Sequence, residues 1–495
     1  METLIVKKKN ESFLHIECEP SVERELSEHF CFYVPGYKFM PAYRNRMWDG
    51  KIRLFDQRAK TIYTGLFKEL KNFAASREYH LLADESKYYG APNEKTDFTD
   101  VSVPLTSKSV PISPRDYQMA AVEHAITNQK SLLLSPTASG KSLIIYKAAR
   151  WYIDNDPSKK ILIIVPTISL VEQMYSDFAD YSETDDGFHI DEWAHKIHGG
   201  MPKGPLLHRI VISTWQSIYK NKAEWFQSFG MVIGDEAHQF KAKSLTAILE
   251  KCTEAKYRIG TTGTLDGTQT HQLVLEGLFG PVHRVTTTKA LMDSNQLAKL
   301  EINSLVLKYK DEYCKLKRDY NEEINFIVGY EPRNKFISNL AIDQDGNSLI
   351  LFNLVDKHGK PLHDMLRKKL EGTDRKLFYI SGETDVDTRE QVRTITEKEK
   401  NAIIVASMGT FSTGVNIRNL HNLIFASPSK SQIRVLQSIG RGLRVSEDGR
   451  DTKVYDLADD LHWKSRKNYT LQHAAERIKI YSKEKFKYKL YDINI

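Results

Sequence analysis

Cysteine is scarce in this sequence of 495 residues, which contains only four of them. They lie far apart, and no two follow the C-x-x-C spacing that is typical of zinc sites and redox disulfides. The four positions are Cys18, Cys31, Cys252 and Cys314. We therefore expect free thiols in a reducing compartment, and neither a disulfide framework nor a zinc site.

Long apolar runs are also missing. The longest, such as ILIIVP at 161–166, have the length of a buried strand and fall far short of the roughly 20 residues that cross a bilayer. The first residues, METLIVKKKNES, lack the apolar stretch and the small-residue cleavage site of a signal peptide. These absences predict a cytoplasmic protein without a membrane partner.

Neither sign of charge dominates, because 71 Lys and Arg residues face 64 Asp and Glu residues, for a net charge of +7. The excess is concentrated in two segments. Residues 37–60 carry seven basic and two acidic side chains, and residues 464–495 carry nine and three. Two separated basic segments suit a polyanionic partner, although solvated surface charge explains either one alone equally well.

The length suggests about three domains. Residues 85–114 have the polar, proline-containing composition of a linker, and beyond Arg115 short apolar runs alternate with longer amphipathic stretches. This alternation is typical of βαβ units on a parallel sheet, and it occurs twice in tandem. We predict an N-terminal nucleic-acid recognition domain at 1–100, two α/β domains at 101–287 and 288–465, and a basic C-terminal tail at 466–495.

The segment SPTASGKS at 135–142 lies between a strand-like run and a helical stretch. It matches the phosphate-loop (Walker A) pattern G-x-x-x-x-G-K-[ST], with serine in place of the first glycine. Gly140 lets backbone N–H groups approach phosphate oxygens at a helix N-terminus, Lys141 reaches the β- and γ-phosphates, and Ser142 helps to hold Mg²⁺. The segment therefore predicts a site for ATP and Mg²⁺.

A second phosphate-site element follows a later strand-like run, in MVIGDEAH at 231–238. Two adjacent carboxylates beyond a buried strand are costly without a cation. We therefore expect Asp235 to bind Mg²⁺, directly or through water, and Glu236 to orient and deprotonate the attacking water.

Further segments, in the same order along the chain, resemble the motifs of the DEAH-type superfamily 2 helicases and translocases. They are RDYQ (115–118), VPTISLVEQ (165–173), STWQS (213–217), TTGT (261–264), ILFNLVDKHG (350–359), MGTFSTGVNI (408–417) and QSIGRGLR (437–444). The resemblance implies an α/β fold of two tandem RecA-like parallel-sheet domains after a small α+β N-terminal domain. It departs from many relatives at Ala138, where they have glycine.

The resemblance also implies roles for individual residues. ATP binding falls to Arg115, Gln118, Thr137, Gly140, Lys141, Ser142 and Gln437, and catalysis to Asp235, Glu236, Arg441 and Arg444, with Arg444 favoured as the arginine finger. Coupling of hydrolysis to movement falls to His238, Thr262 and Thr264. Contacts with nucleic-acid phosphates fall to Thr167, Ser213, Thr214, Gly382, Thr410 and Thr413.

A narrower resemblance lies in the N-terminal part. The segment FYVPGYKFMPAYRNRMWDGKIRLFD at 32–56 is similar to the N-terminal domain of phage UvsW-type helicases. That resemblance implies branched or duplex DNA as substrate, including forks, recombination junctions and RNA–DNA hybrids. It also implies roles in replication, repair and recombination, partners among single-strand-binding or recombination proteins, and a place in the host cytoplasm. The oligomeric state stays open, with a monomer favoured.

Within this segment, Arg44, Arg46, Lys51 and Arg53 are the candidate phosphate contacts. Tyr43 or Trp48 can stack on an exposed base at a branch, but a place for Trp48 in the domain core with Tyr37 and Phe55 is the favoured interpretation. The tail segment YSKEKFKYKLYDI at 481–493 is either a duplex-binding strap or an amphipathic strand packed on the second motor domain.

Other functions are compatible with the same motifs. An RNA helicase shares them, as does the motor subunit of a nuclease complex, although no nuclease-like cluster of acidic residues and lysine is evident in this chain. A nucleotide switch without motor activity need not keep Glu236 and Arg444. An ATP-dependent DNA helicase is therefore the favoured function.

Overall fold

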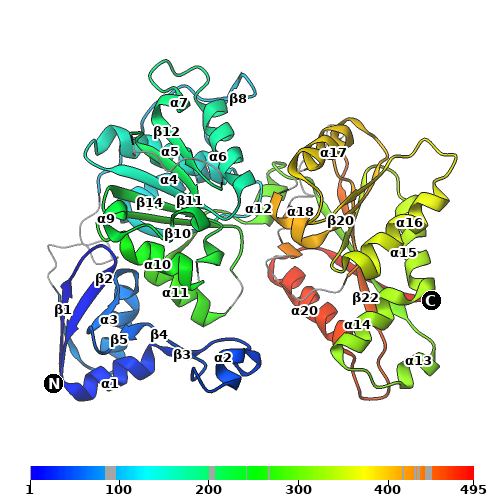
Figure 1. Cartoon of the computed structure of the whole chain (residues 1–495), viewed down its shortest axis with the longest axis horizontal. Coiled ribbons are helices and arrows are strands. Elements are labelled where there is room, and N and C mark those ends of the chain that lie inside the picture. Colours follow the sequence, from blue (N-terminus) through cyan, green and yellow to red (C-terminus); the bar gives the residue numbers. More distant parts are fainter. Residues whose placement is uncertain are drawn as a thin grey trace. The chain divides into compact units, whose positions relative to one another are not determined.

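The structure is a computed structural model (Figure 1). It describes residues 2–83, 96–199, 207–240, 242–265, 268–414, 417, 419–427, 431, 435–436, 438–440 and 449–495. The chain forms two compact units, the first made of residues 1–135 and 140–285 and the second of residues 136–139 and 286–495. Among the described residues, no helix has the length and apolar character needed to cross a membrane.

The first unit begins with a mixed five-stranded sheet in the order β5-β6-β2-β1-β7. Its strands are β1 (Thr3–Lys8), β2 (Phe13–Glu17), β5 (Phe55–Asp56), β6 (Thr61–Tyr63) and β7 (His80–Ala83). Alternation along β1 buries Leu4 and Val6 and exposes Ile5, as expected for a sheet with one covered face. The helices α1 (Pro20–His29) and α3 (Phe67–Ser76) add their apolar side chains to the same core.

A hairpin of residues 31–53, which we call the β3–β4 hairpin, is inserted between α1 and β5. Strands β3 (Cys31–Tyr33) and β4 (Lys51–Arg53) pair antiparallel, and the short helices η1 (Tyr37–Phe39) and α2 (Pro41–Arg44) lie between them. Gly50 has φ +80°, and a Cβ there would lie 2.3 Å from a carbon of the Tyr37 ring. Glycine therefore lets the aromatic ring of Tyr37 lie flat against the returning chain.

The rest of the first unit is a seven-stranded parallel sheet in the order β12-β13-β11-β14-β15-β10-β16. Its strands are β10 (Lys130–Leu134), β11 (Lys160–Val165), β12 (Ala194–Ile197), β13 (Ile210–Thr214), β14 (Phe229–Asp235), β15 (Tyr257–Thr262) and β16 (Val282–Arg284). Its main helices are α4 (Asp116–Asn128), α5 (Lys141–Asn155), α6 (Ile168–Tyr181), α10 (Lys243–Lys251) and α11 (Gln269–Phe279). Figure 1 shows α4 and α5 on the face opposite α10 and α11.

The two faces of this sheet belong to different cores. Successive residues of β10 alternate between them, so that Leu132 packs with the α10 and α11 side chains and Leu133 packs with those of α4 and α5. The core that contains Leu132 also contains the apolar residues of the N-terminal sheet, including Leu4 and Val6. The N-terminal sheet and the first parallel sheet are therefore joined by one continuous apolar core.

Buried polar contacts reinforce this junction. Lys130, at the start of β10, donates a 2.6 Å hydrogen bond to the Glu11 carboxylate, and its side chain is 1% exposed. Arg258 on β15 is fully buried and donates to the Ser12 hydroxyl at 2.6 Å and to the carbonyl of Cys252. Burying a cation without such partners costs several kcal/mol. These contacts therefore fix the loop between β1 and β2 onto the first parallel sheet.

The second unit contains another seven-stranded parallel sheet, in the order β19-β20-β18-β21-β22-β17-β23. Its strands are β17 (Leu300–Lys308), β18 (Ser348–Phe352), β19 (Leu377–Ile380), β20 (Ile403–Ser407), β21 (Asn422–Phe425), β22 (Thr452–Asp460) and β23 (Tyr488–Asn494). Its main helices are α14 (Tyr320–Gly329), α15 (Glu331–Asp343), α16 (Lys360–Lys369), α17 (Val386–Lys398), α18 (Met408–Gly414) and α20 (Tyr469–Lys483). Two parallel sheets after a mixed N-terminal sheet confirm the predicted fold class.

The C-terminal segment is part of this second sheet. β23 pairs in parallel with β17, from Ile302 opposite Tyr488 to Lys308 opposite Asn494. The preceding helix α20 is fixed by a buried ion pair in which Arg477 donates to the Asp456 carboxylate at 2.8 Å. Residues 481–483 end α20 and residues 488–494 form β23, so of the two alternatives the structure shows the packed strand for the second part of the segment 481–493.

Candidate functional site

The phosphate loop lies between β10 and α5, where the sequence places it. Gly140 has φ +79° and precedes the first turn of α5. A Cβ at this position would lie 2.2 Å from Nε2 of Gln118, and the left-handed backbone conformation favours glycine. Ala138 has φ +66°, a strained value for a residue with a side chain. The loop thus directs the N-terminus of a 15-residue helix toward the space where phosphates bind.

Arg115 and Gln118, two of the residues predicted to bind ATP, lie at the start of α4. Gln118 is 4% exposed, and its Oε1 accepts a 2.8 Å hydrogen bond from the backbone N–H of Arg115. The exposed guanidinium of Arg115 donates to the hydroxyl of Tyr117 at 2.9 Å. Gln118 therefore connects this element to Gly140 of the phosphate loop through direct packing.

The two polar side chains that open α5 have partners within the first unit. Nζ of Lys141 lies 3.5 Å from the carbonyl oxygen of Ser135, across the loop. The hydroxyl of Ser142 lies 2.8 Å from the hydroxyl of Tyr181, the last residue of α6. Thr137 is half-buried in the loop itself.

The acidic pair lies at the carboxyl end of β14, whose seven residues are all buried. Asp235 is 7% exposed and accepts a 2.7 Å hydrogen bond from the Thr261 hydroxyl. Burial, and next the charge of Glu236, raise the pKa of Asp235 above its ordinary value, and Lys141 acts in the opposite direction. A cation at this carboxylate relieves the cost of its burial.

His238 connects the acidic pair to the following strand. Its Nδ1 lies 3.3 Å from the Glu236 carboxylate and 3.0 Å from the hydroxyl of Thr262 at the end of β15. The Thr262 hydroxyl in turn lies 3.1 Å from the carbonyl oxygen of Thr264. The structure thus brings together Glu236 and all three predicted coupling residues in one chain of polar contacts.

The donor set fits a magnesium nucleotide. Mg²⁺ prefers hard oxygen ligands, usually one or two from the protein together with phosphates and water. The Ser142 hydroxyl and the Asp235 carboxylate are of this kind, while Lys141 and the start of α5 supply positive charge for phosphates. Three predicted residues of the segment QSIGRGLR lie outside the described residues: Gln437, Arg441 and Arg444.

The predicted phosphate contacts on nucleic acid differ in what they can offer. Ser213 is fully buried and its hydroxyl donates to the carbonyl of Ile197 at 2.9 Å, so this hydroxyl is engaged within the first unit, and a phosphate contact at Ser213 stays a prediction. Thr410 is 8% exposed and hydrogen-bonds Ser407 at 2.7 Å, and Thr214 is 4% exposed. Their hydroxyls mainly hold the strand ends in shape.

Two residues of this set are open to solvent in part or in full. Thr167 is half-buried and caps α6 by accepting from the backbone N–H of Leu170, and Gly382 is exposed. The side chain of Thr413 lies outside the described residues. Thr167 and Gly382 therefore stay predicted contacts with nucleic-acid phosphates.

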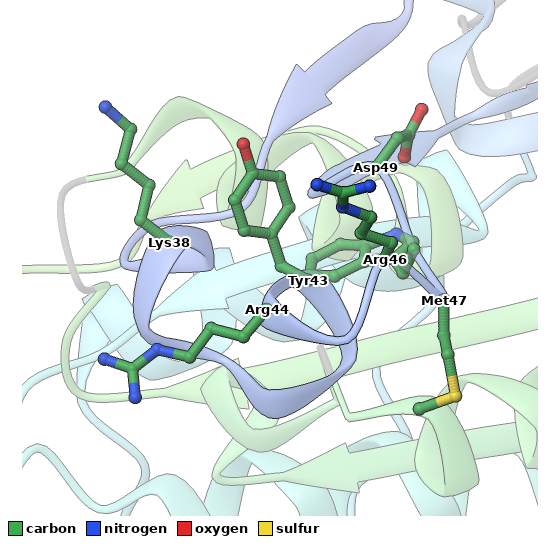
Figure 2. A pocket seen from close by; sticks show the side chains of 7 residues that line it. Lys38, Tyr43, Arg44, Arg46, Met47 and Asp49 are labelled. Atoms are coloured by element: carbon green, nitrogen blue, oxygen red, sulfur yellow. The ribbon is translucent and has the colours of Figure 1, made fainter.

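The β3–β4 hairpin carries an open recess of about 590 Å³ at its end (Figure 2). It is lined by Lys38, Tyr43, Arg44, Arg46, Met47, Trp48 and Asp49. Figure 2 shows Lys38 and Tyr43 pointing to one side of this segment and Arg44 and Met47 to the other. Arg44 and Arg46 are exposed, as a phosphate contact requires.

The two remaining basic candidates are already engaged within the hairpin. Arg53 forms a 2.5 Å ion pair with Asp49, and Nζ of Lys51 lies 4.9 Å from the centre of the Tyr33 ring. Trp48 is half-buried, and its indole N–H donates to the carbonyl of Lys51 at 2.8 Å. Trp48 therefore belongs to the hairpin rather than to the domain core, contrary to the favoured interpretation.

Phe55 and Tyr37 were grouped with Trp48 in that interpretation. Phe55 lies in the core at 1% exposure, as predicted, whereas Tyr37 is half-buried and packs between Tyr33 and Tyr43, with ring centres 4.6 and 4.8 Å away. The rings of the hairpin thus form their own small cluster.

Sequence reasoning missed two exposed apolar side chains in the hairpin. Phe39 is 76% exposed and Met47 is 74% exposed, beside the basic residues Lys38 and Arg46. The alternation of apolar and basic residues in this segment was the available signal. It does not distinguish a side chain that packs inward from one that stays in solvent.

The fold and the site together define a superfamily 2 helicase motor, with the phosphate loop, the DEAH carboxylates and the coupling threonines on one parallel sheet. Three family models match in order along the chain: "DNA helicase UvsW, N-terminal" at residues 4–84, "Type III restriction enzyme, res subunit" at 111–267 and "Helicase conserved C-terminal domain" at 332–446. The ATP-dependent DNA helicase uvsW of Enterobacteria phage T4 is 36% identical over 98% of both chains. The chain belongs to the UvsW family of ATP-dependent DNA helicases.

Solved structures are similar to this one. The crystal structure of T4 UvsW matches 99% of both chains at 33% identity, with a TM-score of 0.52. A putative HsdR subunit of a type I restriction enzyme from Vibrio vulnificus covers 77% of this chain, with a TM-score of 0.57 at 19% identity. The second likeness shows the fold alone.

Proposed function

We propose that this DNA helicase acts on branched DNA, and that it hydrolyses ATP with Mg²⁺ held by Ser142 and Asp235. When bound, the metal supplies charge neutralisation at the phosphates. Lys141 binds the phosphates, and Glu236 takes a proton from the attacking water. His238 connects Glu236 to the Thr262 hydroxyl, so a change at the carboxylate reaches the end of β15.

The observation that carries the branched substrate is the β3–β4 hairpin. Its exposed arginines suit phosphates, while Phe39 and Met47 keep apolar surface in water at a place where no packing requires it. Phenylalanine and methionine are residues that proteins insert between base steps, where they unstack and kink a duplex. A branch point offers unstacked bases at the lowest cost, so the hairpin favours a junction over continuous duplex.

The hairpin also belongs to the same compact unit as β10 and α5, the strand and helix on either side of the phosphate loop. The contacts of Glu11 with Lys130 and of Ser12 with Arg258 join the N-terminal domain to the motor sheet. A junction held at the hairpin therefore stays in register with the first motor domain while ATP is hydrolysed. Forks, recombination junctions and RNA–DNA hybrids at R-loops all present such branch points.

The test is ATPase activity and binding across forks, four-way junctions, R-loops, duplex, and single strands of DNA and RNA. We expect branched DNA to stimulate most, with little sequence preference and a steep loss of affinity as salt rises. Equal or greater stimulation by single-stranded RNA would contradict the proposal and favour an RNA helicase. Lys141→Ala should abolish both ATP hydrolysis and unwinding.

A charge-swap isolates the hairpin. Arg44→Glu with Arg46→Glu should weaken junction binding at least tenfold and leave ATP hydrolysis without DNA unchanged, because both side chains are exposed on the β3–β4 hairpin and belong to none of the elements that form the nucleotide site. Lys68→Glu with Lys71→Glu makes the same change of charge on exposed positions of α3 and serves as the control. Junction affinity that falls equally in both double variants would show that only overall charge matters.

A further inference from the structure

The hydroxyl of Ser142 has a partner that no motif predicts. It lies 2.8 Å from the phenolic oxygen of Tyr181. Ser142 is the second residue of α5, and Tyr181 is the last residue of α6, the helix that begins within the segment VPTISLVEQ (165–173). The contact therefore joins the phosphate loop to a separate helix.

The position of Tyr181 is built into the packing of these helices. Ser142, Tyr146 and Arg150 recur every four residues on α5, so they form one face of that helix. The Tyr181 ring packs against the ring of Tyr146, with centres 5.5 Å apart, and Tyr146 is fully buried. Tyr146 accepts a 2.9 Å hydrogen bond from Arg150, which pairs in turn with Asp185.

A hydroxyl that binds a cation has a directional requirement. The oxygen must turn a lone pair toward the metal, so its proton must point elsewhere and needs an acceptor. Groups next to a metal ligand commonly meet this requirement, and they orient the ligand while they do so. The Tyr181 oxygen is at the correct distance to accept the Ser142 proton.

We propose that Tyr181 is a positioning residue for magnesium: it accepts the Ser142 proton and so presents the serine lone pairs to the metal. This inference rests on the proposed role of Ser142 as a Mg²⁺ ligand. Tyr181 itself binds neither the metal nor the nucleotide. Tyr181 therefore affects only the gain in nucleotide affinity that Mg²⁺ provides, and nucleotide binding without Mg²⁺ does not depend on Tyr181.

The alternative is that the contact only helps α5 to pack on α6. The two interpretations differ in what Tyr181→Phe changes, because phenylalanine keeps the ring against Tyr146 and removes only the hydroxyl. If the contact serves only packing, Tyr181→Phe should slightly lower the stability and leave the enhancement of nucleotide binding by Mg²⁺ unchanged. If Tyr181 positions Ser142, the variant should stay folded and show a smaller enhancement of nucleotide binding by Mg²⁺.

The experiment measures the dissociation constant of a fluorescent, slowly hydrolysed ATP analogue on the full chain, once in EDTA and once in saturating Mg²⁺. The dissociation constant in EDTA divided by the dissociation constant in Mg²⁺ is the enhancement of binding by magnesium. Tyr181→Phe should lower this ratio about tenfold, the lower end of the effect of removing a group that orients a metal ligand, and leave the constant in EDTA within twofold. Tyr146→Phe is the matched control. It removes the neighbouring phenolic hydroxyl, keeps the ring in the same aromatic contact, and should leave the ratio unchanged.

Ser142→Ala completes a double-mutant cycle. The Ser142→Ala, Tyr181→Phe variant should show the same ratio as Ser142→Ala alone, since the tyrosine acts through the serine. Additive effects, an unchanged ratio in Tyr181→Phe, or an equal loss in EDTA would each overturn the inference. A wild-type protein without any enhancement by magnesium would instead refute the proposed metal site itself.

Discussion

Replacing Glu11 with alanine should destabilise the first unit far more than a single surface substitution can. The carboxylate lies 2.6 Å from Nζ of Lys130, whose side chain is 1% exposed. Burial lowers the pKa of Lys130 to about 8, against the attraction of Glu11. Burial alone would raise the pKa of Glu11, but Lys130 and Lys8 outweigh it and lower that pKa to about 2.

The expected cost follows from these values. A shift of the Glu11 pKa from 4.5 to about 2, at about 1.4 kcal/mol per pKa unit, corresponds to about 3 kcal/mol of stabilisation at neutral pH. Removing one partner of a buried pair typically costs about 3–5 kcal/mol, because the other charge stays buried. We therefore expect Glu11→Ala to lower the free energy of unfolding by about 3 kcal/mol.

Urea unfolding followed by tryptophan fluorescence is a suitable assay, because five of the six tryptophans lie within residues 1–285. Glu17→Ala is the control: its pair with Lys7 has a similar distance of 2.7 Å but exposed side chains, so the loss should stay below about 1 kcal/mol. Glu11→Leu with Lys130→Met should recover most of the stability. A cost for Glu11→Ala no larger than that of Glu17→Ala would refute the reasoning.

Two other outcomes follow from the same junction. Because the pKa of Glu11 is depressed in the folded state, its contribution to the free energy of unfolding is present above about pH 4.5 and is lost as pH falls toward 2. Free energies of unfolding measured between pH 6 and 3 should show this loss in the wild type. The Glu11→Leu, Lys130→Met variant should show less of it. Gly65→Ala should cost about 3 kcal/mol in the same urea assay, since its Cβ would lie 2.0 Å from the carbonyl oxygen of Glu276. Gly199→Ala in the same unit, whose Cβ would meet only a carbon of Ile168 at 3.9 Å, should cost much less, and an equally small loss for Gly65→Ala would show that the contact at Gly65 relaxes freely.

The sequence predicts most of the fold and of the nucleotide site because both depend on local patterns. A buried parallel strand reads as a short apolar run, and the residues that follow it reach the carboxyl edge of the sheet, where phosphate sites form. Gly140 lies in the loop that follows β10, Asp235 is the last residue of β14, and Glu236 comes directly after it. Their neighbours along the chain therefore specify where they lie.

Contacts between distant segments leave no comparable pattern. Ser12 and Arg258 are 246 residues apart, and Ser142 and Tyr181 belong to different helices. Trp48 shows the same limit at short range, because an indole can pack in a domain core or satisfy its N–H at a carbonyl within a hairpin. Composition does not decide between these environments.

The junction between the N-terminal domain and the first parallel sheet has a consequence for how such helicases can be recombined. Exchanging residues 1–100 with those of a relative that lacks Glu11 and Ser12 would remove the partners of Lys130 and Arg258, and would leave two buried cations facing unmatched side chains. A transplant that ends after Val285 keeps both contacts and the shared apolar core. In the design of chimeras, the piece to exchange intact is therefore the N-terminal domain together with the first parallel sheet.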